Sequence, residues 1–469
     1  MSFVLPLSLV SADEEGSVSQ LPRLADAAEQ ADWHAVKRLI ADGCELNATQ
    51  PDGMTALHWA ARHGNGRVVR QLIDAKADVD RTTEYGITPL HIGCSLDKGL
   101  VTCLLLGGGA DANLEQAGGV SPLMLAAKAG TPASILRLLR HGAKLDAKER
   151  KGQTALMWAA AAGNAEAIKL LIEKGADVNA TTSVGFTAMM FAARDGHLKA
   201  VQTLYEAGVD VNAVMKPKNS GGRTPRKGTS ALTLAVESGH FELAMFLIRS
   251  GADPNDQRSG FTPLHALTWV RKPDRGENPD GDPPSRGSGN LTSLQFVREL
   301  VEAGADVNVK LTSGKSGKAV LNRKGATPFL LAGKTADLPY LKLLVELGAD
   351  PTFTNTDGCN ALMAAAGVGV RAVGEEAGTE SEVIEAIDYL ITLGVDLNAV
   401  DDNKETAMHG AAYRNFPRVV EFLASKGADS SVWNHKNRSG WTPVMIAQGK
   451  RPGSFKPSPA TVSALQAAM

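Results

Sequence analysis

Short apolar stripes with helical spacing recur along the chain. Residues 55–64 and 66–74 each carry one apolar face, and Thr55 and Gly64 are typical of the start and the end of the first helix. The two faces consist of Leu57, Ala60 and Ala61, then Val68, Val69, Leu72 and Ile73. Because so small a helix pair cannot bury its apolar face alone, the pattern predicts that neighbouring pairs stack on one another.

One tetrapeptide begins each copy of this pattern. It reads Thr-Ala-Leu-His at residues 55–58, and five consecutive copies begin 33 residues apart. A Gly-Ala-Asp-Val-Asn-like ending follows each copy, as at residues 175–179. A period of this length predicts one stacked array rather than several independent domains. The copies begin at Thr55, Thr88, Ser121, Thr154, Thr187, Ser230, Thr262, Thr327, Asn360, Thr406 and Thr442.

These motifs are similar to the ankyrin repeat over about residues 22–469. The resemblance implies an all-α ankyrin-repeat solenoid of about twelve helix-turn-helix units, joined by β-hairpin fingers and capped at both ends. Residues 22–48 then form the N-terminal capping repeat, 49–450 the array, and 451–469 a C-terminal loop and capping helix. The closing stretch, residues 441–457, is also similar to that of a bacterial ankyrin family. A scaffold that binds a protein partner is the function this implies.

Four insertions interrupt the array, at residues 214–229, 271–290, 309–326 and 367–380. The first and third extend fingers, and both carry basic residues but no acidic residue. Because solenoids hold specificity in what is added to the repeat, these two segments are candidates for contact with an acidic partner. Their basic residues are Lys216, Lys218, Arg223, Arg226 and Lys227, then Lys310, Lys315, Lys318, Arg323 and Lys324.

Other candidate contacts come from positions that line the concave face in ankyrin proteins. Arg150, Lys151 and Arg258 stand at fingertips, and Arg194 stands on the outer turn of a first helix, as do Arg62, Lys128, Lys334 and Arg414. Phe186 and Phe261 precede their caps, as do Met54, Ile87, Val120 and Trp441. Trp269 is the strongest single candidate, because Trp is enriched among interface hot spots.

Each candidate also has a simpler interpretation. The basic residues could be ordinary solvated side chains, and the apolar residues before the caps could pack on the neighbouring finger. Trp59 and Trp158 occupy a position that is core in the repeat, so we predict that both are buried. Four histidines end their tetrapeptides, where the family uses His to hydrogen-bond neighbouring loops, and we predict that role instead of metal binding. They are His58, His91, His265 and His409.

Composition gives little reason to expect chemistry or a polyanion. The 469 residues carry a formal net charge of -2. The four cysteines show no zinc-ligand spacing, and we expect no disulfide framework and buried thiols at Cys94 and Cys103. No nucleotide-binding or nucleophile motif occurs, and we expect no enzyme activity and no cofactor. Two alternatives stay open: nucleic-acid binding by the basic groove, and a site built from carboxylates in the insertions. Those carboxylates are Asp274, Glu277, Asp280, Asp282, Glu375 and Glu376.

The first residues suggest export. Residues 3–10 are apolar, and Val10-Ser11-Ala12 has the small-x-small pattern of a cleavage site, although the basic segment that usually precedes such a run is missing. We therefore interpret residues 1–12 as the remnant of a signal peptide and 13–21 as a linker, with a periplasmic or secreted protein as the expectation and a cytoplasmic one as the alternative. We expect no membrane span and a monomer.

Overall fold

The computed structural model describes two compact modules of stacked helix pairs. The N-terminal module comprises residues 1–180 and the C-terminal module residues 181–469. The residues described form 25 helices and no regular strand, and none of these helices is long and apolar enough to cross a membrane. The described residues are 23–218, 226–273, 285, 287–314, 321–370, 373–374, 376–450 and 456–469. Residues 1–22, which carry the predicted export signal, lie outside them.

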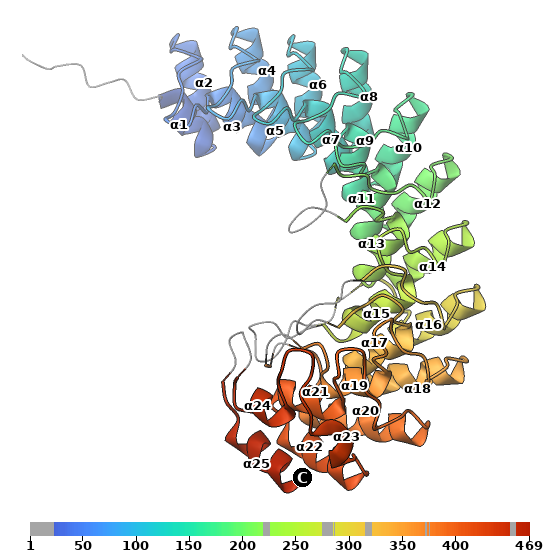
Figure 1. Ribbon diagram of the computed structural model, residues 1–469. Helices are drawn as coiled ribbons and strands as arrows, with labels where there is room; N and C mark the ends of the chain where they lie inside the picture. Colours follow the sequence, from blue (N-terminus) through green and yellow to red (C-terminus); the bar gives the residue numbers. More distant parts are fainter. Residues whose placement is uncertain are drawn as a thin grey trace, which may run out of the picture. The chain divides into compact units, whose positions relative to one another are not determined.

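The N-terminal module stacks successive pairs of short helices. Within each pair a first helix of about two turns is followed closely by an antiparallel second helix, and the first helices of successive repeats lie side by side (Figure 1). The helices are α1 (Arg23–Glu29), α2 (Trp33–Ala41), α3 (Ala56–His63), α4 (Gly66–Asp74), α5 (Pro89–Ser95), α6 (Gly99–Gly107), α7 (Pro122–Ala129), α8 (Pro132–Arg140), α9 (Ala155–Ala161) and α10 (Ala165–Glu173).

The C-terminal module continues the same alternation, with longer connections. Its helices are α11 (Ala188–Arg194), α12 (Leu198–Glu206), α13 (Ala231–Glu237), α14 (Phe241–Arg249), α15 (Pro263–Arg271), α16 (Ser293–Glu302), α17 (Pro328–Lys334), α18 (Leu338–Glu346), α19 (Ala361–Ala366), α20 (Glu380–Thr392), α21 (Ala407–Arg414), α22 (Pro417–Ser425), α23 (Ser430–Trp433), α24 (Pro443–Ala447) and α25 (Pro459–Ala467). Apart from the short α23, the described helices of both modules form twelve pairs, which confirms the predicted helix-pair solenoid.

The tetrapeptide histidines hold each first helix to the next finger. The Nδ1 atom of His58 lies 2.8 Å from the hydroxyl of the cap Thr55, and its Nε2 atom lies 2.9 Å from the carbonyl oxygen of Ile87. His91, His265 and His409 repeat this arrangement. The predicted structural role is confirmed. Burial lowers the pKa of His91 and of His265 to about 4, so these rings are neutral near pH 7.

The repeat endings join neighbouring repeats as well as making turns. The side-chain oxygen of Asn113 accepts a hydrogen bond from the backbone N–H of Lys144 at 2.8 Å, and its amide donates to the carbonyl oxygen of Gly142 at 2.9 Å. Asn255 and Asn308 make the equivalent pair of bonds with the repeat that follows each of them. These three Asn side chains therefore join adjacent repeats along their backbones.

The fingers are hairpins closed by turns rather than by regular strands. The described residues contain only two isolated β-bridges, Gln116 with Val120 and Val214 with Ser230. Neighbouring fingers are joined by single backbone bonds, such as the 3.0 Å bond from the N–H of Lys216 to the carbonyl oxygen of Val184. Each finger is thus anchored to the one before it.

The four cysteines are free thiols. Cys94 is buried, as expected, and burial raises its pKa to about 12. Cys103 is partly exposed, so the expectation of burial is wrong for this residue, while Cys359 is buried and Cys44 is partly exposed.

Candidate protein-binding surface

Four of the predicted contact residues meet at one place in the C-terminal module. The rings of Phe261 and Trp269 meet edge to face with centroids 4.8 Å apart. The guanidinium carbon of Arg226 lies 4.6 Å from the Phe261 centroid, and that of Arg323 lies 5.8 Å from the Trp269 centroid. Both distances are in the range of cation–π attraction. We call these four residues the basic–aromatic cluster.

The two finger insertions deliver the arginines of the cluster. Backbone hydrogen bonds between Met215 and Thr229 close the base of the first insertion, and bonds between Leu311 and Ala326 close the base of the second. Arg226 and Arg323 each lie just before the closing residue of their insertion. Both insertions thus return to the repeat at a fixed point, and this fixes where the two arginine side chains emerge.

The aromatic half of the cluster belongs to the α15 repeat. Trp269 lies in the last turn of α15 and is partly exposed, whereas Phe261 precedes the cap and is only 6% exposed. Phe261 was predicted as a partner contact, but here it packs beneath Arg226 and Trp269 and supports them. The outward surface of the cluster is therefore one indole flanked by two exposed guanidinium groups.

One acidic side chain borders the cluster. Glu237, the last residue of α13, forms an ion pair with Arg226, and the two side chains are 22% and 50% exposed. Ser285 lies at the end of the insertion that follows α15, and its hydroxyl donates to the carbonyl oxygen of Glu237 at 3.1 Å. In the same stretch Ser288 donates its N–H to His240 at 2.8 Å. The end of this insertion therefore holds the α13–α14 turn in place.

A second group of rings and a cation lies in the α11 repeat. The centroids of Phe186 and Phe191 are 4.5 Å apart, and the Arg194 guanidinium lies 5.7 Å and 5.3 Å from them. Arg194 also donates two hydrogen bonds of 2.9 Å to Asp195, which raise the pKa of its guanidinium. Its charge is consequently shared with a neighbouring carboxylate.

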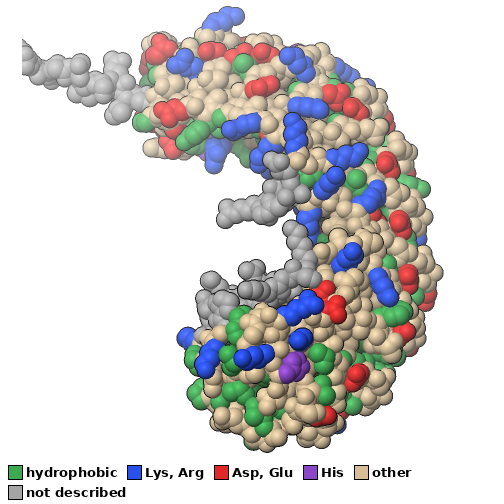
Figure 2. Space-filling view, viewed as in Figure 1, with side chains coloured by type: hydrophobic (Ala, Val, Ile, Leu, Met, Phe, Trp, Pro, Cys, Tyr) green, Lys and Arg blue, Asp and Glu red, His purple; other side chains and the backbone are tan. Residues whose placement is uncertain are grey.

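Five other predicted basic residues of the two finger insertions are exposed side chains. Among the described residues they form no ion pair, and Lys310 stands 4.0 Å from the ring centroid of Phe353. They are Lys216, Lys218, Lys227, Lys310 and Lys324. Arg223, Lys315 and Lys318 lie outside the described residues. Basic side chains are visible on both modules in Figure 2.

Arg150 and Lys151 are exposed at a fingertip of the N-terminal module. The backbone N–H of Arg150 donates a 2.8 Å hydrogen bond to the carbonyl oxygen of Gly118 in the preceding finger. This fingertip is thus fixed within its own module, with both cationic side chains open to solvent.

Three basic residues expected at the groove have internal partners instead. Arg258 makes a two-point contact of 2.8 and 2.9 Å with Asp256 and donates to the carbonyl oxygen of Asn212, so it braces neighbouring fingers. Arg414 is only 5% exposed and donates to the carbonyl oxygens of Ala377 and Gly378. Lys334 pairs with Glu376. These cations are used to hold the fold.

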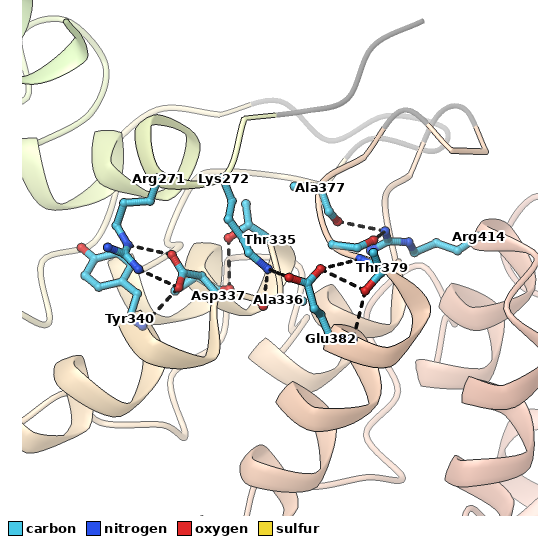
Figure 3. A network of polar contacts seen from close by, with 12 residues as sticks. Arg271, Lys272, Thr335, Ala336, Asp337, Tyr340, Ala377, Thr379, Glu382 and Arg414 are labelled. Atoms are coloured by element: carbon cyan, nitrogen blue, oxygen red, sulfur yellow. Dashed lines mark hydrogen bonds and ion pairs between the residues drawn. The ribbon is translucent and has the colours of Figure 1, made fainter. Parts of the chain in front are cut away.

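A polar network at the end of α15 was not foreseen from the sequence. Arg271 makes hydrogen bonds of 2.7 and 3.0 Å to Asp337, the cap of α18, and Lys272 lies 2.8 Å from Glu382 in α20 (Figure 3). Asp337 is 1% exposed. Because Trp269 lies only two residues before Arg271, this network also fixes the helix end that carries the indole.

Trp59 and Trp158 are half-buried, so the prediction that both belong to the core is wrong. Each ring has a cation nearby: Arg62 lies 5.7 Å from the centroid of the Trp59 ring, and Lys128 lies 5.6 Å from that of the Trp158 ring. Their position falls at the edge of the buried face of the first helix, which leaves the ring partly open to solvent. The N-terminal module therefore has its own partly exposed aromatic residues.

A catalytic or metal site finds little support in the geometry. Across the described ranges no group of three His, Cys, Asp or Glu side chains is placed to hold a metal ion. Glu376 is engaged with Lys334. The remaining candidate carboxylates, Asp274, Glu277, Asp280, Asp282 and Glu375, lie outside the described residues.

Stacked helix pairs joined by fingers define a repeat scaffold of the ankyrin class. A family model described as ankyrin repeats (3 copies) matches residues 24–116, 95–182, 123–215 and 377–454, and another, ankyrin repeats (many copies), matches residues 232–269. These matches cover more than half of the chain, which belongs to the ankyrin-repeat family. Such repeats generally mediate protein–protein interaction, and no catalytic family is indicated.

Similar proteins come from animals and a poxvirus. Human ankyrin repeat domain-containing protein 63 is 30% identical over 256 residues, covering 52% of this chain and 56% of the relative. Its mouse counterpart is 30% identical over 218 residues, covering 45% and 44%. The chain spans about half the length of these curated relatives. The crystal structure of the human ASB11 ankyrin repeat domain matches with a TM-score of 0.42 and 26% identity, covering 49% of this chain and 98% of that one.

Proposed function

We propose that the C-terminal module binds an acidic segment of a protein partner through the basic–aromatic cluster and the exposed lysines of the two finger insertions. The observation that carries this proposal is the meeting of Arg226, Phe261, Trp269 and Arg323, which come from two separate insertions and one repeat. Basic residues that served only to keep an insertion soluble would not need to contact an aromatic ring.

The chemistry of the cluster suits a protein interface. Trp and Arg are the residues most enriched among interface hot spots, and a guanidinium that rests on a ring is partly fixed before binding. A fixed side chain loses less conformational entropy on association. The exposed lysines add a long-range attraction for acidic surfaces, which chiefly accelerates association.

Affinity capture with the purified protein tests this proposal. Wild type, the Arg226→Ala/Arg323→Ala double variant and a matched Lys169→Ala/Lys174→Ala control in the N-terminal module would serve as baits. We expect one acidic protein to be retained by wild type and by the control but lost from the double variant. Its affinity, measured with purified components, should fall steeply as salt rises. Equal capture by all three baits would remove the cluster from the proposal.

A titration with two ligands tests the nucleic-acid alternative. Wild type is titrated with a fluorescein-labelled Glu-rich peptide and, separately, with a labelled single-stranded oligonucleotide. An acidic-protein site predicts that the peptide binds more tightly at equal salt. Tighter binding of the oligonucleotide would replace the acidic-protein proposal with a polyanion site.

We also infer that the protein is exported and that its source is bacterial. The apolar run of residues 3–10 and the small-x-small pattern of residues 10–12 support export, and the likeness of residues 441–457 to a bacterial ankyrin family supports the source. Cell fractionation with a C-terminal tag tests the first inference, because an exported protein is found outside the cytoplasm with a new N-terminus at Asp13. Recovery of the intact chain from the cytoplasm would overturn it.

A further inference from the structure

Glu237 stands out on the surface that we propose for binding. It lies seven residues after its cap Ser230, and the equivalent position carries Arg194 in the α11 repeat and Trp269 in the α15 repeat. An acidic side chain therefore interrupts a row of residues whose chemistry suits an acidic partner. Glu237 forms an ion pair with Arg226, the arginine that rests on Phe261.

The two arginines of the cluster differ in this respect. Arg226 has a carboxylate of its own chain against its guanidinium, whereas Arg323 forms no ion pair within the part of the chain that the structure describes. The neighbouring repeat shows the first arrangement again, because Arg194 rests on two rings and pairs with Asp195. Arg226 and Arg194 therefore each hold a carboxylate of their own chain as well as a ring.

The backbone of Glu237 is held by its helix and by a neighbouring insertion. It ends α13, and its carbonyl oxygen accepts the hydroxyl hydrogen bond of Ser285. Its side chain is 22% exposed, and that of Arg226 is 50% exposed. A carboxylate of a partner can therefore approach the Arg226 side chain, and there it meets the carboxylate of Glu237, which already pairs with the guanidinium.

We propose that Glu237 is an internal competitor that occupies Arg226 and so determines which acidic segments bind. This inference rests on the proposed function and deepens it. An incoming segment has to offer a carboxylate that replaces Glu237 at Arg226, together with a second one for Arg323. A segment with one isolated acidic residue then gains only the Arg323 contact, so the pair selects for clustered acidic residues.

The substitution Glu237→Gln tests the competition. Gln keeps the shape of the side chain and its ability to accept a hydrogen bond from Arg226, but it lacks the charge. We expect the variant to bind a fluorescein-labelled Glu-rich peptide about twofold to fivefold more tightly than wild type at low salt, as measured by fluorescence anisotropy, because a partly exposed ion pair is worth no more than this. Glu206→Gln is the matched control, since Glu206 is exposed at the end of α12 and its loss changes the net charge equally.

The double variant Glu237→Gln/Arg226→Ala separates competition from a general charge effect. Competition predicts that the gain disappears once Arg226 is absent. The inference is overturned if the gain in peptide affinity persists without Arg226, or if Glu206→Gln shows a gain of the same size. It is also overturned if Glu237→Gln binds the peptide more weakly than wild type, because Glu237 would then be positioning Arg226. If instead wild type and Arg226→Ala/Arg323→Ala bind the peptide equally or not at all, the proposed function itself fails. Circular dichroism melting confirms that each variant is folded.

Discussion

The two modules share one repeat but differ in how its surface is used. In the N-terminal module the repeats follow one another at a regular spacing, and none of its described residues forms a side-chain ion pair. All the ion pairs found in the described part of the chain lie in the C-terminal module, which also holds the four insertions. The extra segments and the extra charged contacts occur together.

Four of the nine ion pairs among the described residues involve a residue of an insertion. Arg271 and Lys272 stand where the insertion after α15 begins, and Glu376 and Glu382 stand where the insertion after α19 ends. Lys272 and Glu382 are 110 residues apart in sequence. The network therefore ties together the ends of two insertions that would otherwise loosen the contact between the first and second helices. Insertions into a repeat therefore need stabilising contacts that the repeat itself does not provide.

The largest effect that we expect comes from breaking this anchor. Arg271→Ala leaves Asp337, which is 1% exposed, without its counter-charge, and the free energy of unfolding of the C-terminal module should fall by about 3 kcal/mol. Urea unfolding followed by circular dichroism measures this change.

Arg298→Ala is the control for Arg271→Ala. Arg298 pairs with Glu346 at 2.7 Å between the second helices α16 and α18, and both side chains are exposed, so its loss should lower the free energy of unfolding far less than the loss of Arg271. Similar losses in the two variants would mean that the buried network does not anchor the insertions.

A second prediction contrasts the tryptophans of the two modules. Trp269→Ala should weaken binding of the acidic partner by about 2 kcal/mol, or roughly thirtyfold, because it removes the partly exposed indole on which Arg323 rests. Trp158→Ala removes an indole of similar exposure from the N-terminal module and should leave the affinity within about twofold. Isothermal titration with the captured partner measures both. Equal losses would place the N-terminal module in the interface as well.

Sequence periodicity was enough to predict the helix pairs, their caps and the structural histidines. These features depend on neighbours within one repeat or the next, such as Thr55 and His58, and they recur at a fixed spacing. The surface residues of the cluster could also be named, because the family pattern places fingers and first helices on one side. Their direct contacts with one another could not.

The long-range contacts carried no such signal. Arg271 and Asp337 are 66 residues apart and occur once, so no periodicity relates them. The role of Trp59 was misjudged because a large apolar residue next to a buried position does not reveal whether its outer face is covered. The pairing of Arg258 with Asp256 is local by contrast, and two opposite charges two residues apart could have indicated it, although Arg258 was assigned to the groove.

Acid should destabilise both modules through the buried histidines. Burial lowers the pKa of His409 to about 3, with the His435 ring adding to the effect, whereas an unfolded His titrates near 6.5. The stability that neutral His409 contributes is present above pH 6.5 and is lost as the pH falls towards its folded pKa, by about 1.4 kcal/mol per pH unit. His409→Gln keeps a residue suited to the capping box but does not titrate. Its unfolding free energy should fall less between pH 6.5 and pH 4.5 than that of wild type, and an identical fall would contradict the assignment.

The smallest predicted effect concerns a single finger, whose stability should fall as the pH rises instead of as it falls. Burial raises the pKa of Asp401 to about 6, and the neighbouring carboxylate of Glu405 adds to the rise. Ionised Asp401 therefore costs stability as the pH rises through 6, while its oxygen accepts the N–H groups of Asn403 and Glu405. Asn355 and Asn437 occupy the equivalent position in other fingers and accept the same two bonds without a charge. Asp401→Asn should thus stabilise the C-terminal module by about 1–2 kcal/mol at pH 7.5 and by nothing at pH 4, as measured by urea unfolding at both pH values, and a loss of stability at pH 7.5 would show that the finger requires the carboxylate.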